Sequence, residues 1–210
     1  MKIISYLLLV AAVLFNAGCA SRGPTITNFD LGPLPAPKTL QSTSEYTVKV
    51  LDINTPSGLS GTQMYYRLLY ANAQQAMPYA QSRWSMPPGQ LLTQRVKSRL
   101  AQAGVRVLGA SDGVNAPQLK IELDDFSQHF PSTQQSKGVL SWRISLIQGR
   151  QLVKQMNFTI DNAAATHDAP GGARAIALAS DEAIDLLLDF LVKWLPSAVE
   201  PTSVTKPKSP

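Results

Sequence analysis

The chain has 210 residues, of which 16% are charged, and a formal net charge of +5. This length suits one domain with a sound core rather than two, and a mild basic excess without any run of lysine or arginine favours anionic surfaces such as lipid head groups but gives no nucleic-acid signature. The single cysteine, Cys19, excludes a disulfide within the chain and a metal site built from cysteines.

The N-terminus carries the pattern of an export signal. Lys2 supplies a positive charge, residues 3–15 are almost wholly apolar, and the small residues Ala17 and Gly18 lead to Cys19. The apolar run is shorter than the roughly 20 residues that a membrane-spanning helix needs. Residues 1–18 are therefore predicted to be a signal peptide.

The residues before Cys19 resemble the bacterial lipobox, although Asn16 stands where that motif usually has leucine. Ordinary secretion would also explain the apolar run. In the lipoprotein interpretation, Cys19 carries a diacylglycerol as a thioether, and the new amino terminus carries a further acyl chain such as palmitate. Two or more chains hold a protein stably on a bilayer, so Cys19 is a lipid anchor and no other cofactor is expected. By resemblance to Gram-negative lipoproteins, Ala20 in place of an aspartate points to the outer membrane, with the body in the periplasm.

Both ends of the mature chain have the composition of connecting segments. Residues 19–45 are rich in Pro, Ser, Thr and Gly, and are predicted to form a lipidated tether that contributes one short edge strand at 26–31. Residues 196–210 hold four prolines and no apolar cluster, which predicts a disordered tail. The domain itself is therefore expected over residues 46–195.

Alternating apolar and polar residues predict the strands in chain order. They cover residues 46–50, 63–70, 119–123, 140–146 and 151–161, and the turn at Gln148-Gly149-Arg150 makes 138–161 a hairpin. A helix is predicted from Pro87-Pro88 to Gly104 and another from Gly171-Gly172 to Pro196. We expect an α/β fold in the α+β sense, with a mainly antiparallel sheet and the two principal helices most simply on one face.

The second predicted helix has a wide apolar stripe. Charged residues on its other face, among them Glu182 and Asp189, exclude a membrane-spanning helix, but the stripe is wider than one sheet contact requires. The surplus residues are Leu186, Leu188, Leu191 and Val192. Deep burial is the favoured explanation, and a contact in a homo-oligomer is the alternative.

Residues of catalytic type are sparse. His129 and His167 are the only histidines and are predicted to lie in loops or on the surface, without a metal site. Ser127, His129 and Asp168 can be drawn as a triad, but no Gly-x-Ser-x-Gly elbow supports it, and no catalytic residue is assigned.

Two further pairs of residues resemble functional sites but have simpler explanations as parts of the fold. Asp124 and Asp125 are expected on opposite faces of a strand, whereas a catalytic acid and base must converge. Gly171-Gly172 lacks the Lys-Ser/Thr of a phosphate-binding loop.

A stretch rich in Tyr, Arg, Met and Trp is the most distinctive internal feature. It covers residues 64–70 and 78–88, and these residue types are enriched at protein contacts. Candidates for partner binding are Tyr65, Arg67, Tyr79, Arg83 and Trp84. The alternative is a solvated surface for the first four residues, and for Trp84 a place in the core is favoured.

The sequence resembles the auxiliary lipoproteins of bacterial ABC-type transport systems, the group of PqiC-like outer-membrane lipoproteins. The likeness spans residues 19–195, and its most informative part is Tyr79-Ala80-Gln81-Ser82-Arg83-Trp84-Ser85-Met86-Pro87-Pro88 leading to Leu91-Leu92. Cys19, the segments 29–33 and 64–67, and the terminal Trp194-Leu195 also match.

The resemblance implies a non-catalytic part of a lipid transport system. In such a system a permease and an ATPase work with an MCE-type protein that bridges the periplasm, and the lipoprotein docks that bridge at the outer membrane, with ring-like self-association possible. Two alternatives stay open: a structural envelope lipoprotein that binds peptidoglycan or outer-membrane assembly factors, and an envelope hydrolase, which would need a convergent nucleophile and base.

Overall fold

Three long strands form the centre of the fold in the computed structural model, which describes residues 23, 25–37 and 46–199. β6 (Gln118–Ser132), β7 (Gln135–Gln148) and β8 (Gln151–Ala163) are consecutive antiparallel neighbours. Their core-facing residues pair directly, as in Ile121 opposite Ile144 and Trp142 opposite Phe158. The hairpin predicted at 138–161 is thus present, and it is longer than predicted at both ends.

Five short strands complete an eight-stranded sheet. They are β1 (Thr27–Phe29), β2 (Thr47–Val50), β3 (Gln63–Leu68), β4 (Met77–Trp84) and β5 (Arg106–Leu108). Together with β6 they pair in the order β1-β4-β3-β6-β2-β5, and β7 and β8 continue the sheet from β6. β2 and β3 both pair parallel to β6, at its start and near its end respectively. The sheet is therefore mixed: the long strands are antiparallel as predicted, whereas most short strands join in parallel.

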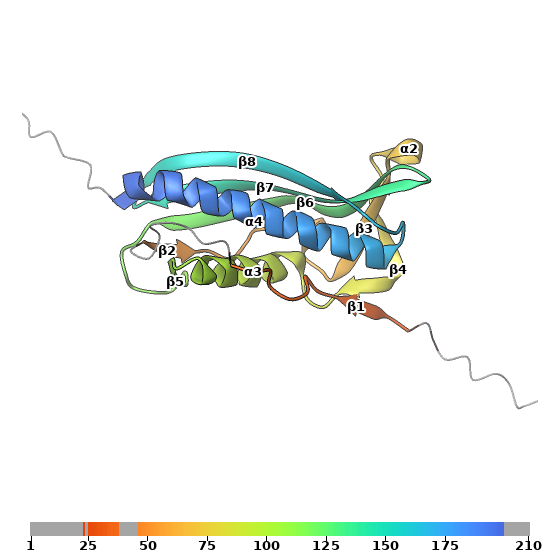
Figure 1. Cartoon of the computed structure of the whole chain (residues 1–210), viewed down its shortest axis with the longest axis horizontal. Coiled ribbons are helices and arrows are strands. Elements are labelled where there is room, and N and C mark those ends of the chain that lie inside the picture. The colour runs from red at the N-terminus through yellow and green to blue at the C-terminus, as the bar shows by residue number, and fades with distance from the viewer. Residues whose placement is uncertain (1–22, 24, 38–45, 200–210) are drawn as a thin grey trace, which may run out of the picture.

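The two principal helices, α3 (Pro88–Gln102) and α4 (Ala169–Val199), lie on the same face of the sheet (Figure 1). This confirms the predicted α+β arrangement. Two shorter helical elements, the 3-10 turn η1 (Ser57–Leu59) and α2 (Leu69–Asn72), connect the short strands. α4 continues through Pro196 to Val199, so the helix extends past the predicted end at Pro196. The tail residues 200–210, and Cys19 with the signal segment 1–18, lie outside the described residues.

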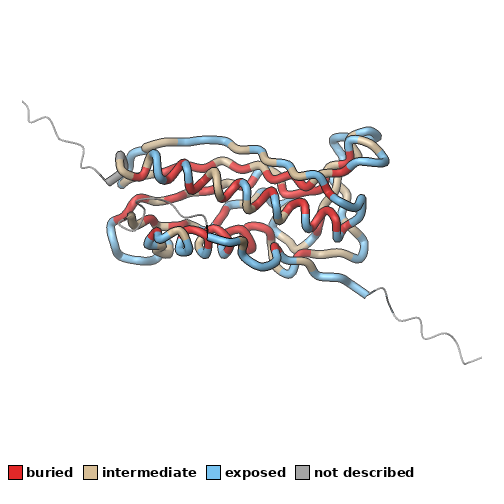
Figure 2. Tube along the Cα trace, in the orientation of Figure 1, coloured by how far each residue is buried: buried red, intermediate tan, exposed pale blue. Residues whose placement is uncertain are grey.

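A single core fills the space between the sheet and the helices (Figure 2). Leu188 and Leu191 of α4 are 1% and 2% exposed, which confirms the deep burial predicted for this part of the stripe. Close packing of α4 on β7 depends on Gly138, because a Cβ there would lie 2.3 Å from the backbone nitrogen of Ile176. Val192 is 37% exposed and does not belong to this core.

A β-bulge in the middle of β6 changes which residues face the core. Leu119, Ile121 and Leu123 face the helices before the bulge, and the pairing with β7 shifts between Leu123 and Asp125. An extra residue inverts the alternation that follows. After the bulge the residues that face the helices are therefore Phe126, Gln128 and Phe130, and the opposite, open face of the sheet receives Asp125, Ser127 and His129. Of these three, Ser127 is itself buried, with 2% exposure.

Candidate functional site

A cluster of polar side chains lies on the open face of the sheet, across β3 and β6. The parallel register sets Tyr65 beside Ser127 and Arg67 beside His129. Tyr65 and Arg67, two of the residues predicted to bind a partner, are half-buried here. The fold thus brings them next to polar residues that lie about sixty positions later in the sequence.

Three side chains of this cluster are joined by hydrogen bonds along one strand. The hydroxyl of Ser127 donates to Oδ1 of Asp125 at 2.6 Å, and Nε2 of His129 lies 3.0 Å from Oδ2 of Asp125 and 3.1 Å from Oγ of Ser127. Burial alone would raise the pKa of Asp125, but the hydrogen bonds from His129 and Ser127 and the positive charges of His129 and Arg67 outweigh it and lower this pKa. Asp125 is therefore a carboxylate at neutral pH.

The arrangement differs from a catalytic triad. In a triad the histidine takes the serine proton on one ring nitrogen while the carboxylate holds the other. Here the same nitrogen of His129 faces both Asp125 and Ser127, and the hydroxyl of Ser127 is committed to the carboxylate. This geometry orders the three side chains but does not activate the serine as a nucleophile.

Asp168, drawn from the sequence as the acid of a triad, lies elsewhere. Its Oδ1 accepts the hydroxyl of Thr166 at 2.6 Å and the backbone N–H of Gly171 at 2.9 Å, and these two hydrogen bonds lower its pKa. Asp168 therefore caps the start of α4, where Gly171 and Gly172 allow close packing. His167 is exposed beside it, as predicted, whereas the prediction of a loop or surface position for His129 was wrong, because it is half-buried within β6.

A small pocket of about 200 Å³ opens beside the cluster. Tyr65, Arg67, Asp124, Asp125 and Ser127 form its polar side, and Pro56, Gly58, Leu59 and Ala76 form the rest of its wall. Asp124 and Asp125 both line it, so the expectation that they point to opposite faces was wrong. The bulge is the reason, since it interrupts strict alternation between these two residues.

Tyr79 lies on the other face of the sheet, under the start of α4. Its hydroxyl donates to Oε1 of Gln128 at 2.8 Å, Nε2 of Gln128 donates to Ser136 at 2.9 Å, and the Ser136 hydroxyl lies 3.0 Å from Nδ1 of His167. Burial, followed by the nearby Tyr66 and Asp168, raises the pKa of Tyr79, so it remains a neutral donor. Tyr79 thus belongs to an internal hydrogen-bond network.

Arg83 and Trp84 are adjacent on β4 and point to opposite sides of the sheet. Trp84 is 1% exposed and packs against Phe126 with ring centroids 5.0 Å apart, which is the core position favoured for it. Arg83 is half-buried and donates to the carbonyls of Tyr79 and Ser82. The predicted partner-binding residues are therefore divided between two faces. Strict alternation would separate Tyr79 from Trp84, but the register of β4 against β3 shifts between Pro78 and Arg83 and sets both on the helix side.

An ion-pair network with buried arginines joins α3 and α4 and was not predicted from the sequence. Arg95 donates to both carboxylate oxygens of Asp181 at 2.9 and 2.7 Å, and Arg99 pairs with Asp185. Both arginine side chains are at most 5% exposed. A signal was available, because each helix repeats its charged residue after four positions, the spacing that places two side chains on one face.

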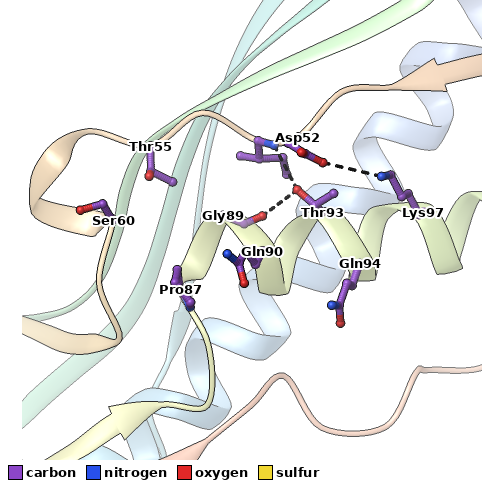
Figure 3. Close-up of a pocket in the computed structure, with 10 residues that line it drawn as sticks. Asp52, Thr55, Ser60, Pro87, Gly89, Gln90, Thr93, Gln94 and Lys97 are labelled. Atoms are coloured by element: carbon purple, nitrogen blue, oxygen red, sulfur yellow. Dashed lines mark hydrogen bonds and ion pairs between the residues drawn. The ribbon is translucent and has the colours of Figure 1, made fainter. Parts of the chain in front are cut away.

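A larger groove, of about 550 Å³, lies at the start of α3 (Figure 3). Its polar groups serve the fold: the Thr93 hydroxyl donates to the carbonyl of Gly89 at 2.7 Å and accepts the N–H of Ile53 at 3.0 Å. Lys97 lies 3.7 Å from Asp52 across the groove. The polar groups of the groove therefore connect α3 to the segment before β3, and their role is structural.

Within residues 23, 25–37 and 46–199, no three His, Cys, Asp or Glu side chains are grouped as a metal ion would need. Across the same ranges, no helix combines the length and apolar character required to cross a bilayer.

Comparison with known proteins identifies relatives of this fold. The model of a family described as "ABC-type transport auxiliary lipoprotein component" matches residues 29–190. No curated protein matches the sequence.

Solved structures share the fold at low sequence identity. The crystal structure of protein XCC0632 from Xanthomonas campestris is 14% identical, with a TM-score of 0.65 over 80% of this chain and 92% of that one. An uncharacterized protein is 15% identical, with a TM-score of 0.65 and coverage of 80% and 99%. The hypothetical protein CT253 from Chlamydia trachomatis is 9% identical, with a TM-score of 0.52 and coverage of 72% and 98%.

Proposed function

The chain belongs to the family of ABC-type transport auxiliary lipoprotein components, and from this premise we propose that it is a non-catalytic, lipid-anchored part of an envelope lipid transport system. Acyl chains on Cys19 fix it to the periplasmic face of the outer membrane. Its folded body docks an MCE-type periplasmic protein that belongs to an ABC transporter.

The cluster on the open face of the sheet is the observation that carries the docking role. Its pocket of about 200 Å³ is smaller than the roughly 300–1,000 Å³ typical of small-molecule sites, and so fits a single side chain of a protein partner. Tyr65 and Arg67 are residue types that anchor protein contacts, and Asp124 and Asp125 add acceptors for a basic or amide group. Ser127 and His129 hold Asp125 in place.

The same geometry supports a non-catalytic role. The hydroxyl of Ser127 donates to the carboxylate of Asp125, and one nitrogen of His129 faces both groups, so the relay in which a histidine stands between serine and carboxylate is not formed. The polar groups of the cluster are therefore suited to recognition.

Replacing Arg67 with glutamine tests the docking surface. The change removes a positive charge beside the pocket while keeping a side chain that can donate a hydrogen bond. We expect Arg67→Gln to lose most co-purification of the MCE-type protein from cross-linked cells, with an unchanged circular dichroism spectrum. Arg150→Gln, the same substitution in the exposed β7–β8 turn, serves as the control. Partner recovery equal to that of the control would refute the role of this surface.

A further inference from the structure

The segment that follows the proposed anchor is fastened to the body as a strap, here defined as residues 25–37. β1 pairs parallel to β4, with Thr27 opposite Ser82 and Phe29 opposite Trp84. The carbonyl of Phe29 accepts the N–H of Ser85 at 2.7 Å. Leu31 of the strap is 6% exposed and belongs to the core, so the strap is an integral part of the fold.

Arg95 fastens the next turn of the strap. Its guanidinium donates to the carbonyl of Gly32 at 2.8 Å and to that of Pro33 at 3.0 Å, in addition to its two bonds to Asp181. One buried arginine thus joins the strap, α3 and α4. Because the guanidinium donors form a rigid fork, this contact fixes where the strap leaves the body.

The strap leaves little chain between the anchor and the body. Eight peptide units separate Cys19 from Thr27, and at no more than about 3.6 Å each they span at most about 29 Å. α4 begins beside the strap, since Asn28 and Pro170 line the same groove, and its 31 residues extend about 46 Å at 1.5 Å per residue. The body is therefore longer than the chain that connects it to Cys19.

The end of the molecule that carries β1 includes two segments without charged residues. α2 and the turn between β6 and β7 lie at this end (Figure 1), which agrees with the pairing of Leu68 and Phe130. Residues 68–82 and 130–136 contain no Asp, Glu, Lys or Arg. Tyr70 of α2 is 50% exposed and Ile26, just before β1, is 53% exposed. Exposed tyrosine and aliphatic side chains suit the head-group region of a bilayer. The guanidinium of Arg67, which donates to the carbonyl of Ala73 at the end of α2 at 3.3 Å, adds one positive charge at this end.

The opposite end is different in chemistry. It carries the end of α4 and the start of β8, where the Nζ of Lys154 lies 4.7 Å from the ring centroid of Trp194. Lys193, Arg150 and Asp112 are exposed there or in adjacent turns. Charged groups of this kind avoid the hydrocarbon interior of a bilayer.

We propose that the end formed by β1, α2 and the β6–β7 turn, here called the strap end, lies against the phospholipid surface and that the strap holds it there. This inference rests on the acylation of Cys19 proposed above. The far end of α4 then points into the periplasm, and the open face of the sheet stands roughly upright on the membrane, accessible to a partner that approaches from the periplasm.

Site-specific fluorescence quenching tests this orientation. Acylated full-length mature protein carries one introduced cysteine with a fluorophore, either Ala71→Cys in α2 or Val114→Cys in the exposed loop before β6, and is reconstituted into phosphatidylcholine vesicles that contain a head-group nitroxide lipid. Because the lipid occupies the thiol of Cys19, only the introduced cysteine is labelled. We expect the label at position 71 to lose most of its fluorescence and the label at position 114 to keep nearly all of it.

Equal quenching at both positions, or stronger quenching at position 114, would overturn the orientation. A flexible Gly/Ser insertion of about 20 residues between Gly23 and Pro24, which raises the number of peptide units between Cys19 and Thr27 from 8 to about 28, is expected to remove most of the quenching at position 71. Unchanged quenching would overturn the role of the strap.

Flotation of the same vesicles separates this inference from the proposed function. Protein that floats but shows no difference between the two labels refutes only the orientation. Protein that does not float refutes the anchor and the orientation together.

Discussion

At the residue scale, one extra residue in β6 decides which side chains meet. Without the bulge between Leu123 and Asp125, strict alternation would place Ser127 and His129 on the core side with Leu119 and Ile121. The sequence does contain a sign of the bulge, because the apolar residues change from odd to even positions after Asp124. The sequence does not show which residues lie beside Ser127 and His129. Tyr65 and Arg67 lie there because β3 pairs with β6.

Asp125 is expected to make the fold sensitive to acid. Because its pKa in the folded protein lies below its ordinary value, the unfolded chain takes up the proton first as the pH falls. The stabilisation is therefore complete above about pH 4 and is lost as the pH falls through the folded-state pKa. We expect Asp125→Asn to unfold at a lower urea concentration than the wild type at pH 7, with this difference shrinking at about pH 3.

The neighbouring Asp124 provides the matched control, because it is exposed. Asp124→Asn should leave the urea midpoint close to that of the wild type at both pH values. If the difference in urea midpoint between Asp125→Asn and the wild type stays constant from neutral to acidic pH, the ionised carboxylate of Asp125 is not the source of the stabilisation.

At the element scale, α3 and α4 are joined by two arginine–aspartate pairs. Both helices were predictable from their apolar periodicity, yet the charged residues of α4 were only placed opposite its apolar stripe, without a partner. Asp181 and Asp185 instead meet Arg95 and Arg99 of α3. The difference arises because periodicity shows which residues share a face, but not which other element covers that face.

Arg95→Met is expected to destabilise the protein by about 3 kcal/mol, because it leaves the partly buried carboxylate of Asp181 without its main partner and removes a donor from Gly32 and Pro33. The double variant Arg95→Met/Asp181→Leu should recover part of this loss, since no buried charge remains uncompensated. Urea unfolding measures both values, with Arg106→Met, at an exposed position of β5, as the control. A double variant that is less stable than the sum of its single variants would contradict this explanation.

At the scale of the whole molecule, the strap makes the N-terminal segment part of the domain. The composition of residues 19–45 predicts a tether, and the division of the chain at residues 18, 45 and 195 stays a prediction. Residues 25–37 nevertheless contribute an edge strand, a core leucine and two carbonyls bound to Arg95. A proline-rich composition indicates a low tendency to form regular structure. It does not indicate whether the folded body provides hydrogen-bond partners for the backbone of that segment.

Cys19→Ser is expected to release the protein from the membrane without changing its fold. Serine cannot form the thioether, and Cys19 precedes the first residue of the strap, so thermal unfolding of the mature body should be unchanged. Membrane fractionation of cells measures the release, with Ser21→Ala as the neighbouring control. Mass spectrometry of the wild-type N-terminus supplies an independent check, and an unmodified Cys19 there would refute the anchor whatever the fractionation shows.

The sequence by itself determined the local elements, the α+β class and the family, because alternation, helical periodicity and a linear motif such as Arg83-Trp84 before Pro87-Pro88 depend on residues that are close along the chain. The tertiary structure alone decided the parallel pairing of β2 and β3 with β6, the division of Tyr65 and Tyr79 between two faces, and the contact of Arg95 with the strap. These features join residues that are distant in sequence, and their free energy depends on the shape and partners that the rest of the fold provides. Local patterns therefore cannot encode them.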